Sequence, residues 1–247
     1  MPAAPRRTAL AAALSAAFAL AATACGPSTD AAKPAGPFGD LTGSQIVDKA
    51  FAATRDAKSL TVDVDLRSPG EPTKGYLSLD ARGRCAGTLT VETTHTAELV
   101  KPDDKNVYLR FDEAFLRKQV EDESPEVQEA TLKELNGRWM KSSVSDPDAK
   151  DMLALCDLKT LLGGFEPGAS GIVKGAETTV DGRGALALSE PGDGGESSTV
   201  YVATEGTPYV LRIVTKGGEE PGTITFSKYG LPVAAKAPAA KDVVETG

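Results

Sequence analysis

The residues of this 247-residue chain that are best suited to covalent or acid–base chemistry are three cysteines and one histidine. Cys25 follows an apolar segment, whereas Cys85 and Cys156 lie within the body of the sequence. A cysteine nucleophile needs a base within hydrogen-bond reach, and His95 is the only histidine available. Because His95 stands between two threonines in a predicted strand, we expect it to face solvent. The cysteines are therefore predicted to anchor and brace the chain rather than to catalyse a reaction.

Residues 1–24 predict a signal peptide that ends at Cys25. Two arginines precede an uncharged run of thirteen residues, 8–20, which is too short to span a bilayer core of about 30 Å. The residues A-T-A-C that end at Cys25 are similar to a bacterial lipobox, with alanine where leucine is usual. We expect acylation of Cys25, which would anchor an extracytoplasmic protein to the cell membrane. The alternative is an ordinary signal peptide that leaves an unmodified thiol.

An acylated Cys25 leaves an even pair, Cys85 and Cys156, in a compartment that permits disulfides. A bond between them would close a loop of about 72 residues, and the chain-entropy model gives it roughly 4 kcal/mol. The sequence favours this disulfide. The alternative is two buried thiols that pack as small apolar side chains.

Motifs for other chemistry are missing from the sequence. It contains no nucleophile elbow, Walker loop or dinucleotide fingerprint. Asp146, Asp148 and Asp151 lack the glycine and the distal glutamate of a calcium loop, and Pro147 is better suited to a helix start. The formal charge of −8 and its scattered distribution disfavour a nucleic-acid partner. We expect no catalytic residue, metal or cofactor.

Residues 25–41 are rich in proline, glycine and alanine, which predicts a flexible tether. Ordered structure is expected to begin after it. Thr42 and Gln45 have the spacing of a capping box, which predicts a helix of about 14 residues. Its predicted apolar face consists of Ile46, Val47, Ala50, Phe51, Thr54 and Ala57.

The remaining sequence up to residue 235 predicts a single α+β domain, residues 42–235. Alternating apolar residues indicate about ten strands in an antiparallel sheet, within 59–67, 77–81, 87–91, 95–101, 107–111, 172–179, 185–189, 199–204, 209–215 and 223–229. Helix formers at 112–119, 125–135 and 147–162 interrupt them. Helices must then cover one face of the sheet. Residues 236–247 are expected to form a loosely held tail.

The order of these segments resembles actinobacterial exported lipoproteins of the LppX/LprG type, which have a LolA-like fold. The resemblance is carried by the lipobox, the helix and strand GSQIVDKAFAATRDAKSLTVDVDLR, and the segments CAGTLTV, AELVKPDDKNVYLR and GRWMK. It implies a strongly curved half-barrel whose concave side is closed by helices around an apolar cavity. Members of this family are thought to bind or carry lipids or lipoglycans. The pair Cys85 and Cys156 and the acidic segment EDESPEVQE depart from the family, which leaves ligand identity open.

Two functions follow as hypotheses. The first is a monomeric, membrane-anchored lipoprotein that holds acyl chains of a lipid or lipoglycan in this cavity. The second is a structural, sensor or protein-docking lipoprotein with a filled core. For the first, strand alternation and the helix pattern predict these cavity-lining residues: Val62, Val64, Leu77, Leu79, Leu89, Val91, Leu109 and Phe51. A shift of one residue in register would turn the strand residues to the opposite face.

Overall fold

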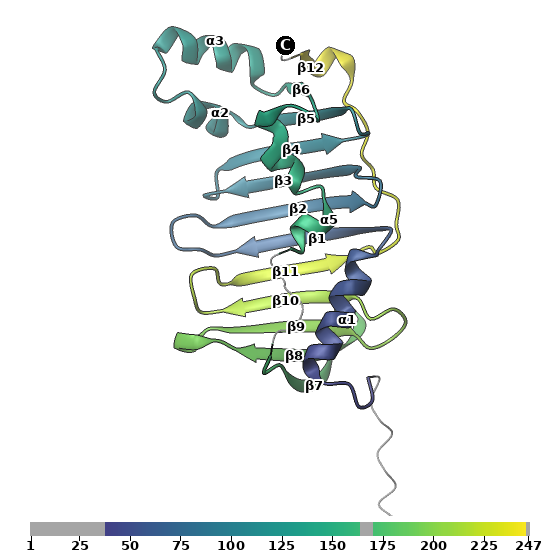
Figure 1. The fold of residues 1–247 in the computed structure, drawn as a ribbon. Coiled ribbons are helices and arrows are strands. Elements are labelled where there is room, and N and C mark those ends of the chain that lie inside the picture. The colour runs from purple at the N-terminus through teal and green to yellow at the C-terminus, as the bar shows by residue number, and fades with distance from the viewer. Residues whose placement is uncertain (1–37, 164–169, 246–247) are drawn as a thin grey trace, which may run out of the picture. The chain divides into compact units, whose positions relative to one another are not determined.

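Residues 38–163 and 170–245 are described by a computed structural model, and they belong to one compact unit that spans Gly36–Gly247. This unit is built on a 12-stranded sheet with the order β12-β6-β5-β4-β3-β2-β1-β11-β10-β9-β8-β7 (Figure 1). The sheet is open, since β12 and β7 stand at its two ends, and this fits the expected half-barrel. The fold class is α+β as predicted, but the expected ten strands omit β6 and β12.

Two antiparallel meanders make up the sheet. The first consists of β1 (Ser59–Leu66), β2 (Thr73–Asp80), β3 (Cys85–Val91), β4 (His95–Lys101), β5 (Asn106–Phe111) and β6 (Trp139–Ser143). The second consists of β7 (Val173–Val180), β8 (Arg183–Pro191), β9 (Ser197–Ala203), β10 (Val210–Lys216) and β11 (Gly222–Ser227). Antiparallel pairing of β1 with β11 joins them into one sheet.

The helices are short apart from two. They are α1 (Gly43–Arg55), α2 (Glu113–Gln119), α3 (Pro125–Leu135), α4 (Lys150–Ala154) and α5 (Leu158–Leu161), with 3-10 turns η1 (Pro147–Ala149), η2 (Asp193–Gly195) and η3 (Ala240–Asp242). The predicted capping box starts α1, because Thr42 accepts from the Gln45 backbone at 3.2 Å and donates its own N–H to the Gln45 side chain at 2.8 Å. The single helix predicted over 147–162 is instead η1, α4 and α5 in succession.

We call the face of the sheet that carries α1, α4 and α5 the covered face, and the opposite side the open face (Figure 1). On the covered face, α1 lies across the second meander, while α4 and α5 lie over the first (Figure 1). The main hydrophobic core fills the space beneath them. A smaller cluster of Val180, Ala185, Ala203 and Leu211 forms separately.

Residues 144–172 connect the two ends of the sheet. Nine strands stand between β6, where this segment starts, and β7, where it finishes, which corresponds to about 48 Å across the sheet. Ala149, Cys156 and Leu162 from its first part are buried in the main core, and Ile172 packs against the same core. We call these residues, 144–172, the crossover. The crossover thus places part of the chain on the covered face of the first meander.

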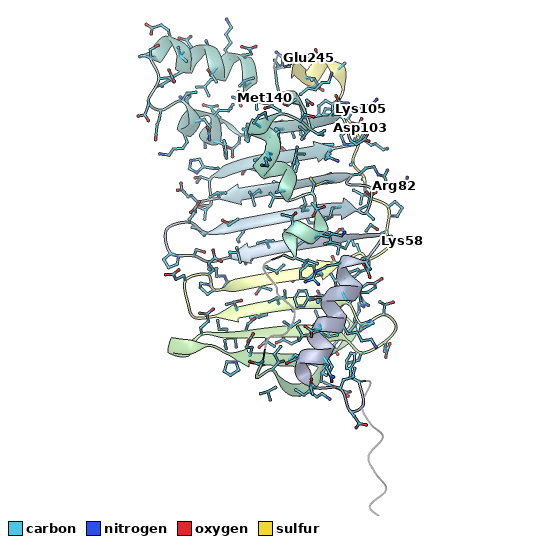
Figure 2. The ribbon with its side chains drawn as sticks, in the orientation of Figure 1. Lys58, Arg82, Asp103, Lys105, Met140 and Glu245 are labelled. Carbon is cyan, nitrogen blue, oxygen red and sulfur yellow. A yellow bond between two sulfur atoms is a disulfide. The ribbon has the colours of Figure 1, made fainter. Side chains whose placement is uncertain are left out.

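The end of the described chain is docked on the sheet, in contrast to the loosely held tail that was expected. Ser59 donates to the carbonyl of Leu231 at 2.6 Å, and its own carbonyl accepts from Gly230 at 2.9 Å. Further on, β12 (Val243–Glu245) pairs in parallel with β6, beside Met140 (Figure 2). An ion pair of 2.9 Å between Glu245 and Lys141 joins the same two strands.

A buried threonine attaches α1 to the second meander. Thr54 is fully buried, and its hydroxyl oxygen accepts a hydrogen bond from the backbone N–H of Val210 at 3.0 Å. The pairing of β10 with β9 shifts register between Val210 and Arg212, so this N–H falls at a bulge. The phenol of Tyr229 donates to the carbonyl of the same Val210, and burial raises the pKa of that phenol.

Substitution of Thr54 tests this attachment. Thr54→Val keeps the shape of the side chain but leaves the Val210 N–H buried without an acceptor, which should lower the free energy of unfolding by about 1–3 kcal/mol. Thr54→Ser retains the hydroxyl, so its free energy of unfolding should fall by less. Urea denaturation of both variants measures the difference, and equal losses would contradict the role of the hydrogen bond.

Candidate functional site

The floor of the candidate site is set by strand register on the covered face. Directly opposite residues of antiparallel strands share a face, so the pairing builds rows of side chains across the sheet. One row runs in the order Val62, Leu77, Gly87, Leu99 and Leu109 from β1 to β5. The strand residues predicted to line a cavity therefore share one face with Leu99.

A second row lies next to the first and contains smaller side chains. It runs in the order Val64, Gly75, Leu89, Ala97 and Phe111 over the same five strands. Large and small residues thus alternate along the row. Where a glycine or an alanine stands between larger neighbours, its small side chain leaves space above the sheet.

Gly87 is required by a close approach of neighbouring backbone. A Cβ at this position would overlap the carbonyl oxygen of Tyr76 and lie 2.8 Å from the side chain of Leu77. Gly75 is less constrained, because a Cβ there would meet Leu89 at 3.2 Å, at the end of a flexible side chain. Gly87 therefore fixes the strand geometry, whereas Gly75 mainly leaves space.

An apolar pocket of about 60 Å³ lies above these small residues. Its floor comes from β1–β4 and includes Val62, Val64, Gly75, Leu77, Gly87, Leu89, Ala97 and Leu99. Its roof comes from the crossover, through Leu155 and Leu161. The pocket has room for a few water-sized groups, and its walls offer them almost no polar partner, so it suits apolar atoms.

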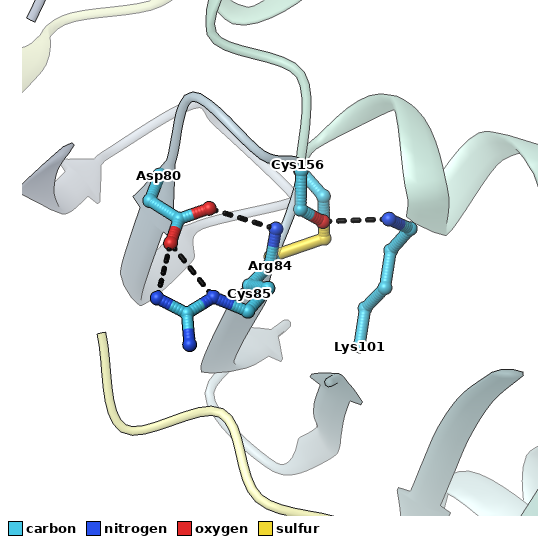
Figure 3. The surroundings of a disulfide bond; sticks show 6 residues. Asp80, Arg84, Cys85, Lys101 and Cys156 are labelled. Carbon is cyan, nitrogen blue, oxygen red and sulfur yellow. Dashed lines mark hydrogen bonds and ion pairs between the residues drawn. A yellow bond between two sulfur atoms is a disulfide. The ribbon is translucent and has the colours of Figure 1, made fainter. Parts of the chain in front are cut away.

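A disulfide between Cys85 and Cys156 ties the roof to the floor. Cys85 begins β3, and Cys156 lies in the short segment between α4 and α5. Figure 3 shows the bond between them. Both cysteines are buried, with exposed fractions of 0% and 4%. The disulfide predicted from the sequence is therefore present, and it holds the crossover against the edge of the pocket next to Leu155.

The hairpin turn that precedes Cys85 is braced by charged side chains. Asp80 accepts from the backbone N–H of Arg84 at 3.1 Å and pairs with its guanidinium at 2.7 Å (Figure 3). From the neighbouring strand, Lys101 donates to the carbonyl of Gly83 at 2.6 Å. These contacts fix the position from which Cys85 reaches the crossover.

On the other side of the disulfide, Asp157 caps α5. Its carboxylate accepts from the backbone N–H of Thr160 at 2.7 Å, and this bond lowers the pKa of the Asp157 carboxyl. Because the folded pKa is below the ordinary value of 3.8, the cap contributes fully above that pH and is lost as pH falls through the lower value. α4 and α5 contain only five and four residues, so their helical form depends on such local contacts and on packing.

Four of the eight predicted lining residues border this pocket, namely Val62, Val64, Leu77 and Leu89. The other four do not. Leu79, Leu109 and Phe51 belong to the filled core, and half-buried Val91 lies near the end of β3, opposite His95. Phe51 lies away from this pocket because its helix, α1, packs on the second meander.

The lining residues that were not predicted from the sequence include the small residues of the floor, Gly75, Gly87 and Ala97, together with Leu99, Leu155 and Leu161. A usable signal was present: the small residues occupy inward positions of strands whose other inward positions are large. Cys25 lies outside the described residues.

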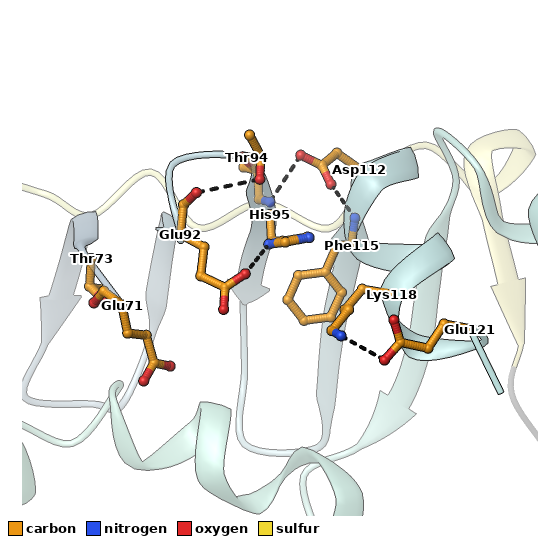
Figure 4. Close-up of polar contacts among 10 residues, drawn as sticks. Glu71, Thr73, Glu92, Thr94, His95, Asp112, Phe115, Lys118 and Glu121 are labelled. Carbon is orange, nitrogen blue, oxygen red and sulfur yellow. Dashed lines mark hydrogen bonds and ion pairs between the residues drawn. The ribbon is translucent and has the colours of Figure 1, made fainter. Parts of the chain in front are cut away.

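His95 is half-buried rather than solvent-facing. Its side chain is 20% exposed, its Nδ1 lies 3.2 Å from the carboxylate of Glu92, and its ring meets Phe115 of α2 edge-on (Figure 4). His95 and Cys85 also lie at opposite ends of the β3–β4 hairpin, since Val91 pairs with His95 and Cys85 with Lys101. This arrangement does not supply a cysteine–histidine pair.

Within the described ranges, no group of three or more histidine, cysteine, aspartate or glutamate residues is placed to hold a metal ion. The side chains of Asp148 and Asp151 lie outside the part that can be described, and Asp146 accepts from the hydroxyl of Ser142. Among the described helices, none is long and apolar enough to cross a membrane.

Removal of the disulfide tests its contribution to the fold. Cys85→Ala with Cys156→Ala should lower the free energy of unfolding by about 2–5 kcal/mol, because the unfolded chain gains a loop of conformational freedom. Urea denaturation of a protein that also carries Cys25→Ala measures this loss. A reducing agent should destabilise the parent by a similar amount and leave the double variant unchanged. A reductant effect on the double variant would contradict this interpretation.

Comparison with known proteins identifies the fold. LprF from Mycobacterium bovis has 16% sequence identity and a TM-score of 0.51, over 80% of this chain and 97% of that chain. The Mycobacterium tuberculosis lipoprotein LppX has 15% identity and a TM-score of 0.49, over 78% of this chain and 98% of that chain. No family model matches the sequence, and no curated protein matches it either. The resemblance to LppX-type proteins that the sequence predicts thus extends to the three-dimensional fold, which this chain shares with LprF.

Proposed function

We propose that this chain is an extracytoplasmic lipoprotein that binds or carries acyl chains of a lipid or lipoglycan between its sheet and the crossover. The observation that carries the proposal is the apolar pocket, which lies under the crossover and is floored by small residues of β2, β3 and β4. The LppX-type resemblance and the fold shared with LprF support the same function.

The pocket must widen to accept an acyl chain. Its volume of about 60 Å³ is small beside the roughly 300–1,000 Å³ of typical ligand sites. The floor is part of a continuous hydrogen-bonded sheet, whereas the roof consists of the short helices α4 and α5 and the residues between them. We therefore propose that Leu155 and Leu161 move away from the floor when ligand enters, while the disulfide keeps the crossover attached.

The two halves of the covered face differ in a way that supports this location. Under α1, the core is filled by large side chains, including Ile46, Phe51, Leu188, Ile213 and Phe226. Under the crossover, the floor contains Gly75, Gly87 and Ala97. A ligand is therefore expected beside the crossover rather than beside α1.

Filling the pocket tests the proposal. Ala97 is buried in the floor, so Ala97→Leu adds three carbon atoms where a ligand would lie. We expect binding of fluorescent palmitate to weaken by about tenfold or more, since one methylene in an apolar pocket already changes affinity by about tenfold. Ala52→Leu adds the same atoms on an exposed position of α1 and should bind like the parent.

Both proteins should carry Cys25→Ala, so that no acyl group is attached covalently. Native mass spectrometry of the purified parent should detect a co-purified acyl lipid. If the parent binds neither palmitate nor any lipid from the cell, the carrier function is wrong and a lipoprotein with a filled core is favoured. Equal affinities of Ala97→Leu and parent would place the ligand elsewhere.

We also propose anchoring through acylated Cys25, the position predicted by the lipobox. In an exporting host, the parent should fractionate with membranes, whereas Cys25→Ser should be released into the extracytoplasmic fraction, because it lacks the thiol that is acylated. The double variant Cys85→Ala with Cys156→Ala is the control and should stay with membranes. Membrane retention of Cys25→Ser would exclude this anchor.

A further inference from the structure

A second hollow lies on the open face of the sheet, outside the acyl-chain site. It has a volume of about 550 Å³ and is lined from β11, β1, β2 and β3. We call it the open-face groove and define it by Asp63, Asp65, Lys74, Tyr76, Thr88 and Thr223. Nearly all of its side chains are polar, which separates it from the pocket on the covered face.

Register brings these side chains together. Asp63 of β1 is paired with Tyr76 of β2, and Tyr76 is paired in turn with Thr88 of β3. In the next row, Asp65 is paired with both Thr223 and Lys74. Because opposite residues of antiparallel strands share a face, the six residues project into one space from four adjacent strands.

The ring of Tyr76 is held in position by contacts at its hydroxyl. The Tyr76 oxygen accepts from the ammonium of Lys228 at 3.0 Å and from Ser78 at 3.4 Å, and Ser78 is itself 2.8 Å from Thr61. The same ammonium lies 5.2 Å from the centre of the Tyr76 ring. Tyr76 nevertheless remains 40% exposed. The groove thus contains a fixed, partly open aromatic ring.

Several polar groups beside this ring are uncommitted. Asp63, Lys74, Thr88 and Thr223 make no side-chain hydrogen bond to any residue in the described ranges, 38–163 and 170–245. They offer a carboxylate, an ammonium group and two hydroxyls, so that both donors and acceptors are available. Asp63, Lys74 and Thr88 are exposed, so these groups are accessible to a ligand from solvent.

The charges around the groove nearly balance. Asp63 and Asp65 are opposed by Lys74 and Lys228, and a further cation, Arg67, lies at the margin, where it is paired with Asp65 at 3.4 Å. A phosphate group would need a clear excess of positive charge, and a cation would need the reverse. An uncharged ligand with many hydroxyls needs neither, because it can donate to carboxylates, accept from ammonium groups and place its C–H face on an aromatic ring.

We propose that the open-face groove binds an uncharged saccharide, with one sugar ring against Tyr76 and its hydroxyls bonded to Asp63, Lys74 and Thr88. This site is distinct from the proposed acyl-chain site, because the side chains that define it project from the opposite face of the sheet. Four residues nevertheless border both hollows, namely Val64, Gly75, Tyr76 and Thr88. The protein would then bind a glycan through its sheet while its crossover side holds an acyl chain.

NMR titration of the full chain carrying Cys25→Ala tests the proposal. Chitotriose and maltotriose serve as uncharged probes, and trigalacturonic acid and inorganic phosphate as anionic ones. We expect an uncharged probe to shift amide resonances of β1, β2, β3 and β11 around the groove. The proposal is overturned if neither uncharged probe shifts these resonances, or if only the anionic probes do.

Variants of Tyr76 identify the contact. Tyr76→Ala should weaken saccharide binding by about tenfold, which corresponds to about 1.4 kcal/mol for loss of a stacked ring. Tyr76→Phe keeps the ring and should retain most of the affinity. Thr178→Ala, at an exposed position of β7, is the control for changes elsewhere on the sheet. Parent-like affinity of Tyr76→Ala would overturn the site.

Ala97→Leu separates this proposal from the proposed lipid function. It fills the pocket on the covered face and should leave saccharide affinity unchanged. A parallel loss of saccharide binding in Ala97→Leu would show that the two sites are one, and would overturn the assignment of a separate saccharide site.

Discussion

The order of strands in the sheet imposes the constraint on which the remaining structure depends. The first meander finishes at β6 and the second begins at β7, and these strands lie on either side of nine others. The chain must therefore pass from one end of the sheet to the other between them. The described part of this connection before residue 164 lies on the same face as α1, where Ala149, Cys156 and Leu162 are buried. The crossover is thus both a connection and the cover of half the sheet.

The two covers of the sheet have different physical properties. α1 is a capped helix of 13 residues whose apolar side faces large residues of β8–β11, and Thr54 joins it to the backbone of β10. The crossover contains only short helical pieces, and a covalent bond holds it at Cys156. The sheet thus has a single long helix over a filled core on one half, and short helical pieces over small residues on the other.

Local signals in the sequence were sufficient to predict α1 and the buried faces of β1–β3. A capping box starts the helix, and strict alternation of apolar residues determines which side of each strand is buried. β6 and β12 could not be found in this way, because Trp139–Ser143 shows no alternation and Val243–Glu245 is a strand only through its pairing with β6. Residues 147–162 were predicted as one helix, since their composition favours helix, whereas the structure divides them into η1, α4 and α5.

Prediction of the pocket failed in part for a related reason. The predicted lining residues were bulky and apolar, but space arises where side chains are small, as at Gly75 and Ala97. The groove on the open face escaped attention because threonine and aspartate at outward strand positions are typical of any solvated sheet. Only register shows that Tyr76, Asp63 and Thr88 belong to one row.

The pairing of β1 with β11 has a consequence for how the molecule assembles. Within each meander, most neighbouring strands are also neighbours in sequence, so their hairpins can form early. Thr61 and Ser227, by contrast, are brought together only after nearly the whole domain has been synthesised. Until then, β1 and β11 each present a free edge that can pair with a strand from another molecule. The centre of the finished sheet is therefore exposed to aggregation until synthesis of the domain is nearly complete.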